Sequence, residues 1–161
     1  MAEGAAPHPA IVSTALRPDL AETTGRWRWA EFFGRNGVDR DTVLGLERAA
    51  ARSEGPLPRV LVALRGDAPI GMATLASEDL DTRPDLTPWL AGVYVLPGHR
   101  RQGHARRLVA AVEDLARSGG FSTLWLYTRS AEPLYRACGW RAAETFARQG
   151  RRYVLMRRDL A

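Results

Sequence analysis

The part of the sequence best equipped for chemistry is an arginine- and glycine-rich segment near the middle of the chain. This segment, GHRRQGHAR at residues 98–106, follows the apolar run VYVL at residues 93–96 and precedes an amphipathic stretch. A turn between a strand and a helix exposes free backbone N–H groups at the helix N-terminus, where the helix dipole favours anions. Arginine adds full positive charge in a geometry that suits phosphate. The segment therefore predicts a binding site for a ligand that carries phosphate groups.

The spacing within this segment narrows the kind of ligand. Arg100-x-x-Gly103-x-Ala105 fits the pattern Q/R-x-x-G-x-G/A and resembles the signature of the GNAT N-acetyltransferases. In that family the segment binds the pyrophosphate of acetyl-coenzyme A (acetyl-CoA). The G-x-G-x-x-G fingerprint of dinucleotide-binding proteins is absent. A Walker loop is also excluded, because its pattern requires a lysine and all 23 Lys and Arg residues of this chain are arginine.

The pattern of apolar and turn residues predicts the elements that must position this segment. The strongest helix is expected at residues 101–118, where Leu108, Val112 and Ala116 share one stripe and Glu113 is expected largely outside it. Because a helix separates the strands before and after it, these two strands are expected to be parallel. The other expected helices are a region beginning at residue 17, residues 41–52 and residues 131–137. The expected strands are residues 10–16, 59–64, 70–76, 89–96, 121–128, 140–147 and 151–158.

A second motif lies one strand and one helix further along the chain. Residues 128–140 have the pattern T-x-x-A-x-x-x-Y-x-x-x-G-W, with Thr128, Ala131, Tyr135, Gly139 and Trp140 at its fixed positions. It resembles the GNAT pattern N-x-x-A-x-x-x-Y-x-x-x-G-[FW], with threonine in place of the asparagine. The element order also resembles that of the family from Ala10 onward, and the piece PDLTPWLA at residues 84–91 resembles a bacterial subgroup.

The resemblance implies a fold and a set of ligand-binding residues. The expected fold is the α/β (α+β) GNAT acyl-CoA N-acyltransferase fold, a mixed, mostly antiparallel sheet of six to seven strands with helices on both faces. Residues 1–9 are expected to be a flexible lead and residues 10–161 a single domain. The sheet is expected to splay open beside the strand at residues 89–96, with acetyl-CoA as cosubstrate and no metal. The expected coenzyme-binding residues are Val93, Tyr94, Val95, Arg100, Arg101, Gln102, Gly103, His104, Ala105, Arg106 and Thr128.

Tyr135 is the candidate catalytic residue that the resemblance implies. Its family counterpart lies near the coenzyme sulfur, and a phenol with an ordinary pKa near 10 can protonate a departing thiolate at neutral pH. The alternative is a tyrosine that packs in its helix and only positions the sulfur. Thr128 either takes the place of the family asparagine and hydrogen-bonds the pantetheine arm or the backbone, or simply ends its strand.

The general base is not identified by the sequence. Residues 88–96 contain no carboxylate, so either an acidic residue of the preceding loop or a chain of water molecules could take the proton. The acidic loop residues are Glu78, Asp79, Asp81 and Asp85.

Some other residues have both a structural and a functional interpretation. They are four aromatic residues, the single cysteine and the histidines. The aromatic residues at 27, 29, 32 and 33 either wall the acceptor pocket or pack in the core. Cys138 is expected to be a small buried residue, not an acetyl carrier. His99 and His104 are expected to be exposed turn residues that, with His8, form no metal set.

Composition limits the other classes of function. The chain has 161 residues, 45% of them hydrophobic, and a net charge of +5. No run is long enough to span a bilayer, the N-terminus does not resemble a signal peptide, and the single cysteine fits a reducing cytoplasm. The excess of arginine would suit nucleic acid, but outside residues 100–107 the arginines are dispersed and no nucleic-acid motif is present.

These observations predict an acetyl-CoA-dependent N-acetyltransferase. It is expected to transfer the acetyl group directly, in a ternary complex, to a primary amine of a small and cationic acceptor. The alternatives are a non-catalytic acyl-CoA-binding or sensing module and an enzyme that acetylates peptide or protein amines. The expected location is the cytoplasm, with no nucleic-acid or membrane partner and a monomeric or homodimeric state.

Overall fold

The computed structural model describes residues 8–161, so the expected flexible lead at residues 1–9 lies almost entirely outside the described part. The first half of the chain forms two antiparallel strands, β2 (Arg59–Arg65) and β3 (Ala68–Ala76), preceded by a helical region. The elements before them are β1 (Ala10–Ser13), the 3-10 helix η1 (Pro18–Leu20), α1 (Ala21–Arg28), the π-helix η2 (Trp29–Phe33), the 3-10 helix η3 (Gly34–Asn36) and α2 (Arg40–Arg52). Asp39 caps α2 by accepting a hydrogen bond from the Thr42 N–H at 3.2 Å.

The second half alternates strands and helices before a closing hairpin. Its elements are β4 (Trp89–Val95), the 3-10 helix η4 (Pro97–His99), α3 (His104–Ser118), β5 (Thr123–Thr128), α4 (Glu132–Ala137), β6 (Arg141–Arg148) and β7 (Arg151–Asp159). The prediction of α3 is confirmed except at its start, which lies three residues later than residue 101. The reason is local, because Arg101 and Gly103 adopt positive φ and keep the turn from being helical.

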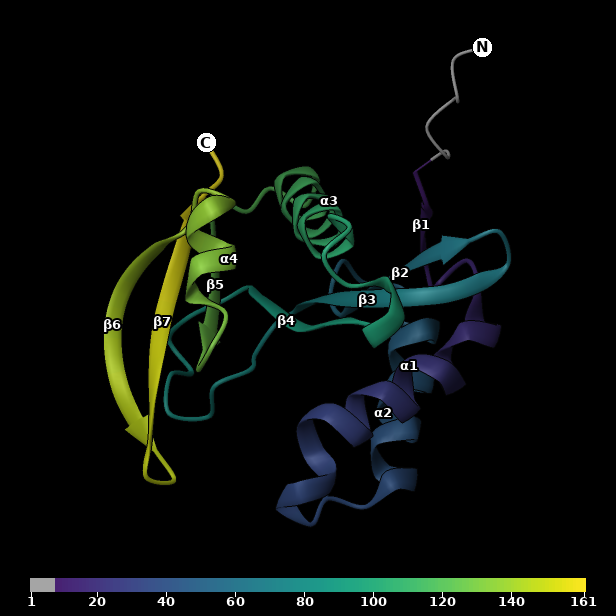
Figure 1. The fold of residues 1–161 in the computed structure, drawn as a ribbon, viewed down its shortest axis with the longest axis horizontal. Helices are drawn as coiled ribbons and strands as arrows, with labels where there is room; N and C mark the ends of the chain where they lie inside the picture. The colour runs from purple at the N-terminus through teal and green to yellow at the C-terminus, as the bar shows by residue number, and fades with distance from the viewer. Residues whose placement is uncertain (1–7) are drawn as a thin grey trace.

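The strands form one mixed sheet of seven in the order β1-β2-β3-β4-β5-β7-β6. All neighbours are antiparallel except β4 and β5, which are parallel as predicted. These two strands are paired at a single position, Trp89 opposite Trp125, and then separate. Figure 1 shows the result, with β1–β4 and β5–β7 as two wings of a sheet that has opened between β4 and β5.

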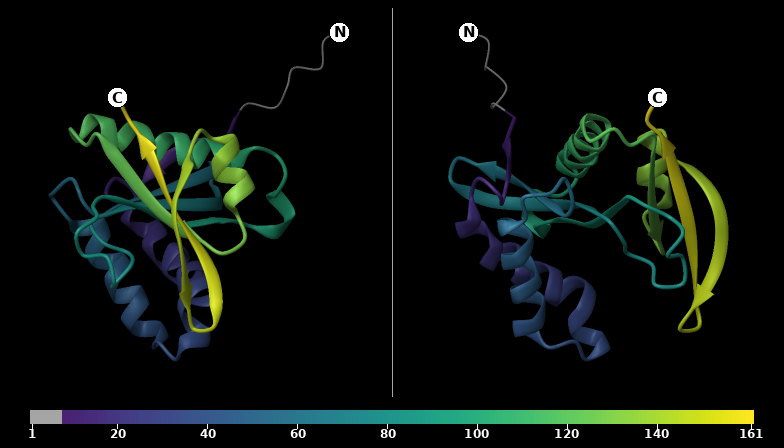
Figure 2. Two further views of the ribbon diagram at one scale, coloured as in Figure 1. Left: turned by 90° about the vertical axis from the view of Figure 1, so that its left-hand side faces the viewer. Right: turned by 180° about the vertical axis from the view of Figure 1, so that it is seen from behind.

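Helices cover both faces of the sheet, as the sequence predicted. On one face, α3 and α4 bury the main core, in which Leu108, Val112, Tyr135 and Trp140 pack against the strands. On the other face, Leu20 and the α1–α2 pair cover β1 and β2, with Val62 and Leu64 in the contact. Figure 2 shows α3 and the α1–α2 pair on opposite sides of the β1–β4 wing. Within residues 8–161, no helix combines the length and the apolar character needed to cross a membrane.

One charged side chain of α3 does not follow the prediction. Glu113 was expected largely outside the apolar stripe, but it is 6% exposed. Its Oε1 accepts hydrogen bonds from Trp140 Nε1 at 3.0 Å and from Arg158 Nε at 3.2 Å. Because the carboxylate has both a neutral and a charged donor, it is tolerated within the core. These contacts tie α3 to β7 and to Trp140, the residue before β6.

Candidate active site

The opening between β4 and β5 has its origin in an irregular residue of β4. Gly92 has a φ of +60°, and the register between β3 and β4 shifts between Met72 and Thr74. A bulge of this kind bends the strand and ends its regular pairing. A side chain at this position would collide with Arg28, since a Cβ would lie 2.8 Å from its Nη1. Beyond Gly92, β4 therefore has one free edge, suited to pairing with an extended amide-bearing ligand.

The turn between β4 and α3 has the geometry of an anion site. Arg101 and Gly103 have φ of 61° and 83°, and α3 begins at the next residue, His104. The Arg107 N–H donates to the Gly103 carbonyl at 3.2 Å, and within residues 8–161 no backbone carbonyl accepts from the N–H groups of residues 102–106. A non-glycine residue in the left-handed region is strained and is often found at a functional site. The turn thus leaves consecutive N–H donors free at the positive end of a 15-residue helix.

Two side chains stabilise this turn from within. Arg100 donates from Nε to the Val95 carbonyl at 2.9 Å, and its guanidinium lies 5.7 Å from the centroid of the Tyr94 ring. His104, predicted to be exposed, is instead 4% exposed and its ring lies between Arg107 Nη1 and Gln102 Oε1, each at 3.3 Å. Burial, followed by the charge of Arg107, lowers the pKa of His104. The imidazole of His104 is therefore neutral at neutral pH and adds no positive charge to the turn.

One cavity of about 750 Å³ brings most of the predicted site residues together. It is lined by Tyr135 and by nine of the predicted coenzyme-binding residues, which are Val93, Tyr94, Val95, Arg100, Arg101, Gly103, His104, Ala105 and Arg106. Gln102 and Thr128 are not among its lining residues. The Thr128 hydroxyl oxygen accepts from the Ala131 N–H at 3.0 Å, a contact that holds the start of α4. The residues present fit a long ligand with an anionic end, since a free strand edge leads from Val93 to a cationic turn.

Tyr135 lies on α4 across the opening from β4. The residue is 8% exposed, and its ring centroid lies 6.1 Å from that of Trp140. It forms no side-chain hydrogen bond within residues 8–161. Burial is the main cause that raises its pKa to about 12, with a smaller effect from Cys138. The phenol therefore keeps its proton throughout the neutral range. Cys138 ends α4, is half-buried, and has a thiol pKa raised by burial, so it is a poor nucleophile there.

Glu31 is a cavity residue that the sequence reasoning did not single out. It is the one carboxylate among the lining residues of the 750 Å³ cavity and is exposed. It belongs to the π-helix η2, and π-helical segments are frequent at functional sites. The aromatic cluster at residues 27–33, which surrounds Glu31, was the feature of the sequence that could have pointed to it. Within that cluster, the ring centroids of Trp27 and Tyr94 are 5.5 Å apart. The Trp29 indole N–H instead donates to the Val38 carbonyl and so holds the connection between α1 and α2.

The face opposite α3 and α4 carries a second group of polar residues. Arg28 forms an ion pair with Glu47 and a hydrogen bond with Thr74, and its side chain is 13% exposed. Glu47 is itself 4% exposed and also accepts from the Thr24 hydroxyl at 2.9 Å. This network joins α1, α2 and β3 and places a guanidinium directly against Gly92 at the bulge.

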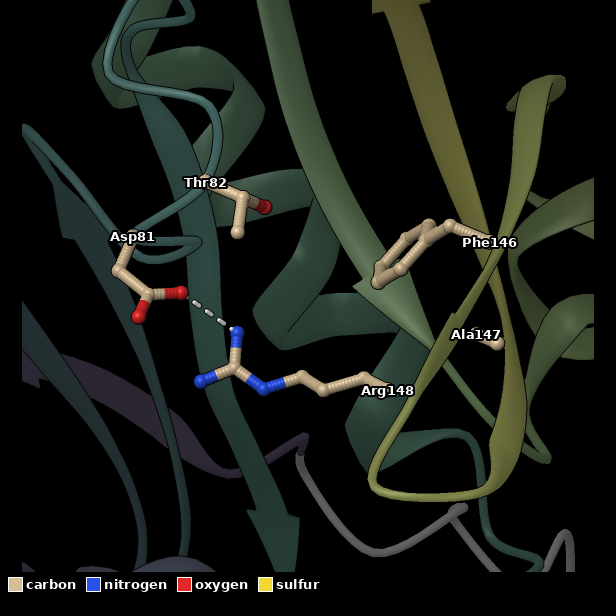
Figure 3. A pocket seen from close by; sticks show the side chains of 5 residues that line it. All are labelled: Asp81, Thr82, Phe146, Ala147 and Arg148. Atoms are coloured by element: carbon tan, nitrogen blue, oxygen red, sulfur yellow. Dashed lines mark hydrogen bonds and ion pairs between the residues drawn. The ribbon is translucent and has the colours of Figure 1, made fainter.

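At the β5–β7 wing of the sheet, the loop at residues 77–88 contacts the β6–β7 hairpin. Residues 77–88, between β3 and β4, contact the β6–β7 hairpin through Asp81 with Arg148 at 2.8 Å and Arg83 with Glu144 at 2.9 Å. A hollow of about 250 Å³ lies between them, lined by Asp81, Thr82, Phe146, Ala147 and Arg148. Figure 3 shows the Phe146 ring and the Asp81–Arg148 ion pair turned toward this hollow.

The class of the protein is defined by its mixed sheet, which splits between β4 and β5, and by the cationic turn that lies beside the split. This is the acyl-CoA N-acyltransferase fold that the sequence predicted. The family model for GNAT acetyltransferases matches residues 21–140, and the chain belongs to the GNAT acetyltransferase family. Members of this family are acetyl-CoA-dependent N-acetyltransferases, and the chain is accordingly an acyltransferase.

Comparison with solved structures supports the fold over almost the whole chain. A GNAT-family acetyltransferase from Desulfovibrio desulfuricans aligns with a TM-score of 0.73 at 21% identity, covering 94% of this chain and 99% of that one. The acetyltransferase YncA from Salmonella typhimurium, solved with its cofactor acetyl-CoA, aligns with a TM-score of 0.67 at 20% identity over 96% and 95%. An aminoglycoside 6'-N-acetyltransferase complexed with coenzyme A aligns with a TM-score of 0.74 at 13% identity over 94% and 97%. No curated protein matches the sequence at a significant level.

Proposed function

We propose that the protein transfers the acetyl group of acetyl-CoA to a primary amine of a small, cationic acceptor, by direct transfer in a ternary complex. The observation that carries the proposal is the single cavity in which the free edge of β4, the cationic turn before α3, and Tyr135 meet. Two solved structures of the same fold contain acetyl-CoA or coenzyme A, which supports the same ligand here.

Each part of the cavity has a separate task in this proposal. The backbone of Val93–Val95 pairs with the amide groups of the pantetheine arm, and the N–H groups of residues 102–106 bind the pyrophosphate. Arg100, Arg101 and Arg106 add charge-assisted contacts, since all three line the cavity. Thr128 remains a proposed contact of the pantetheine arm, with its hydroxyl hydrogen free to donate. The thioester then lies between β4 and Tyr135.

The transfer itself requires one proton to leave the acceptor and one to reach the sulfur. The neutral amine attacks the thioester carbonyl, and the C–S bond breaks as the C–N bond is completed. Tyr135, whose pKa is raised to about 12, holds the proton that the departing thiolate takes. Direct transfer is favoured because the one cysteine, Cys138, has a raised thiol pKa and does not line the cavity.

A cationic acceptor is supported by the distribution of charge on the face opposite α3. The loop at residues 77–88 contributes Glu78, Asp79, Asp81 and Asp85, and Glu31 lies at the cavity. An aminoglycoside acetyltransferase of the same fold acts on a polycationic molecule, which is consistent with such an acceptor. The proposal includes a cytoplasmic, bacterial location, supported by the lone cysteine, and a monomer or homodimer.

Turnover of acetyl-CoA with a panel of small amines tests this function. Free thiol is measured over time while the acetylated product is identified by mass spectrometry. Product with a diamine and a Kd for acetyl-CoA in the micromolar range are expected. Binding of acetyl-CoA without turnover across small amines and peptide amines would instead identify a sensing module, and turnover confined to peptides would identify a peptide or protein acetyltransferase.

A further inference from the structure

We propose that Glu113 is a positioning residue for acetyl transfer, and that it acts by fixing the place of Tyr135 through the indole of Trp140. This inference rests on the proposed function, in which Tyr135 gives its proton to the departing thiolate. It is carried by a hydrogen-bond network that joins α3, the turn after α4 and β7, and whose residues do not line the 750 Å³ cavity.

Tyr135 depends on support from outside its own helix. With six residues, α4 is too short to be stable without tertiary contacts. Because the Tyr135 side chain forms no hydrogen bond within residues 8–161, the place of its hydroxyl is set by packing alone. Its ring lies 6.1 Å from that of Trp140, centroid to centroid, and both residues are buried in the main core. The position of the phenol therefore depends on the position of the indole.

The backbone after α4 joins these two residues a second time. The Tyr135 carbonyl accepts from the N–H groups of Cys138 and Trp140, each at 3.0 Å. Between these two donors, Gly139 has a φ of 92° and ends the helix in a tight turn. A movement of Trp140 is thus passed to Tyr135 by the backbone as well as by the ring.

Glu113 holds this turn at two points. Its Oε1 accepts from Trp140 Nε1 at 3.0 Å and from Arg158 Nε at 3.2 Å. Arg158 in turn donates from Nη1 to the Gly139 carbonyl at 3.0 Å. Because an indole has a single N–H donor, no other hydrogen bond of this ring can replace the one to Glu113. One carboxylate of α3 therefore holds the turn directly through the indole and indirectly through a guanidinium of β7.

The helix that carries Glu113 is also the helix that binds the coenzyme in the proposed function. It begins at His104, directly after the cationic turn, and Glu113 lies about 14 Å further along its axis. A rigid helix thus sets the separation between the pyrophosphate and Tyr135, which the pantetheine arm has to span. Removing the Glu113 carboxylate frees α4 to shift against this helix, and a shift of about 1 Å at a reacting group can cost about 100-fold in rate.

The test is a double-variant cycle, measured as kcat for acetyl transfer from acetyl-CoA to 1,4-diaminobutane. Glu113→Ala should lower kcat about 10- to 100-fold with Tyr135 present, and by less than about twofold in the Tyr135→Phe background. Glu113→Gln keeps an oxygen acceptor for the indole and should restore kcat to within about threefold of the wild type. The Kd for acetyl-CoA should stay within about twofold throughout, because Glu113 does not line the cavity.

Two further variants support this cycle. Trp140→Phe removes the donor of the same hydrogen bond, so it carries the cycle even if Glu113→Ala does not fold. It should lower kcat about 10-fold, again only with Tyr135 present. Asp114→Asn is the matched control, since Asp114 is the neighbouring carboxylate of α3, is exposed and pairs with Arg117. It should leave kcat unchanged, and urea unfolding confirms that each variant is folded under the assay conditions.

The results that would overturn the inference are separate from a failure of the proposed function. If Glu113→Ala and Trp140→Phe each lower kcat by the same factor in both backgrounds, the network supports the fold in general and does not act through Tyr135. If Glu113→Ala keeps the wild-type kcat, the place of Tyr135 does not depend on Glu113. In both cases the proposed acetyl transfer stands. If instead the wild type binds acetyl-CoA but acetylates none of the amines, the proposed function fails and this inference fails with it.

Discussion

The two faces of the opening between β4 and β5 are built in different ways. On the α3–α4 side, the turn at residues 98–106 is cationic, and the residues that shape it are near neighbours in the sequence. Arg100 contacts Val95, and His104 contacts Gln102 and Arg107. On the α1–α2 side, the contacts span long stretches of chain, from Arg28 to Thr74 and from Asp81 to Arg148.

This difference matches the chemistry that the proposed function assigns to each face. A pyrophosphate can be bound by consecutive N–H groups and a few arginines, so one short segment suffices. In the proposed function the α1–α2 side is the acceptor face, and an acceptor needs charge and shape from several directions. Side chains from α1, the loop at residues 77–88 and the β6–β7 hairpin meet on this face. Variants on the acceptor face should therefore affect stability and acceptor use, whereas variants at the turn should affect coenzyme binding.

The largest expected effect is the loss of the buried ion pair on the acceptor face. Arg28→Met leaves Glu47, which is 4% exposed, without its charged partner. Removing one member of a buried pair lowers the free energy of unfolding by about 3–5 kcal/mol. Urea unfolding measures this change. The double variant Arg28→Met/Glu47→Leu should recover most of the loss, and an equal loss in both variants would contradict the explanation.

Tyr135→Phe should have the largest effect on turnover at the α4 side. Loss of a general acid lowers kcat by about 100-fold, and the Kd for acetyl-CoA should stay within about twofold because the ring remains packed on Trp140. Because the pKa of Tyr135 is about 12, the wild-type rate should show no fall from its deprotonation below pH 10. Steady-state kinetics gives kcat, and stopped-flow binding gives the Kd for acetyl-CoA. Unchanged turnover would remove Tyr135 from the mechanism.

Gly103→Val should weaken coenzyme binding without altering the acceptor face. A β-branched residue at a φ of 83° strains the turn by about 1–3 kcal/mol, which corresponds to a rise of about 5- to 150-fold in the Kd for coenzyme A. Isothermal titration calorimetry gives this constant. Gly98→Ala is the matched control, since a Cβ at Gly98 meets no atom within 4 Å and its φ is not positive. Equal weakening by both substitutions would show that the conformation at Gly103 is not the cause.

The smallest expected effect is at the contact between the loop and the hairpin. Arg83 pairs with both Asp85 and Glu144, and all three side chains are partly exposed. Because exposed ion pairs contribute little, Arg83→Gln should raise the KM for the acceptor only about two- to threefold, with the Kd for coenzyme A unchanged. Steady-state kinetics with 1,4-diaminobutane provides the measurement. A change in coenzyme binding instead would mean that the two faces are coupled.

The sequence predicted local features well and long-range burial poorly. The helices and strands follow from apolar periodicity and from turn residues, and the parallel pairing of β4 and β5 follows from the helix between them. Glu113 and His104 were expected at the surface and are buried. Both errors have the same cause, because their partners lie on other segments or depend on the exact path of the turn, and residue type alone favours exposure for both.

The sequence by itself determined the family, the cationic turn, the order of the elements and the candidate acid, Tyr135, because each depends on residues close together in the chain. Tertiary structure alone decided which carboxylate lines the 750 Å³ cavity. Glu31 differs little from the other acidic residues in the sequence. Its position depends on the π-helix at residues 29–33, and the opening depends on the bulge at Gly92 and the separation of β4 from β5. These features arise from packing between distant segments, so no short stretch of sequence contains them.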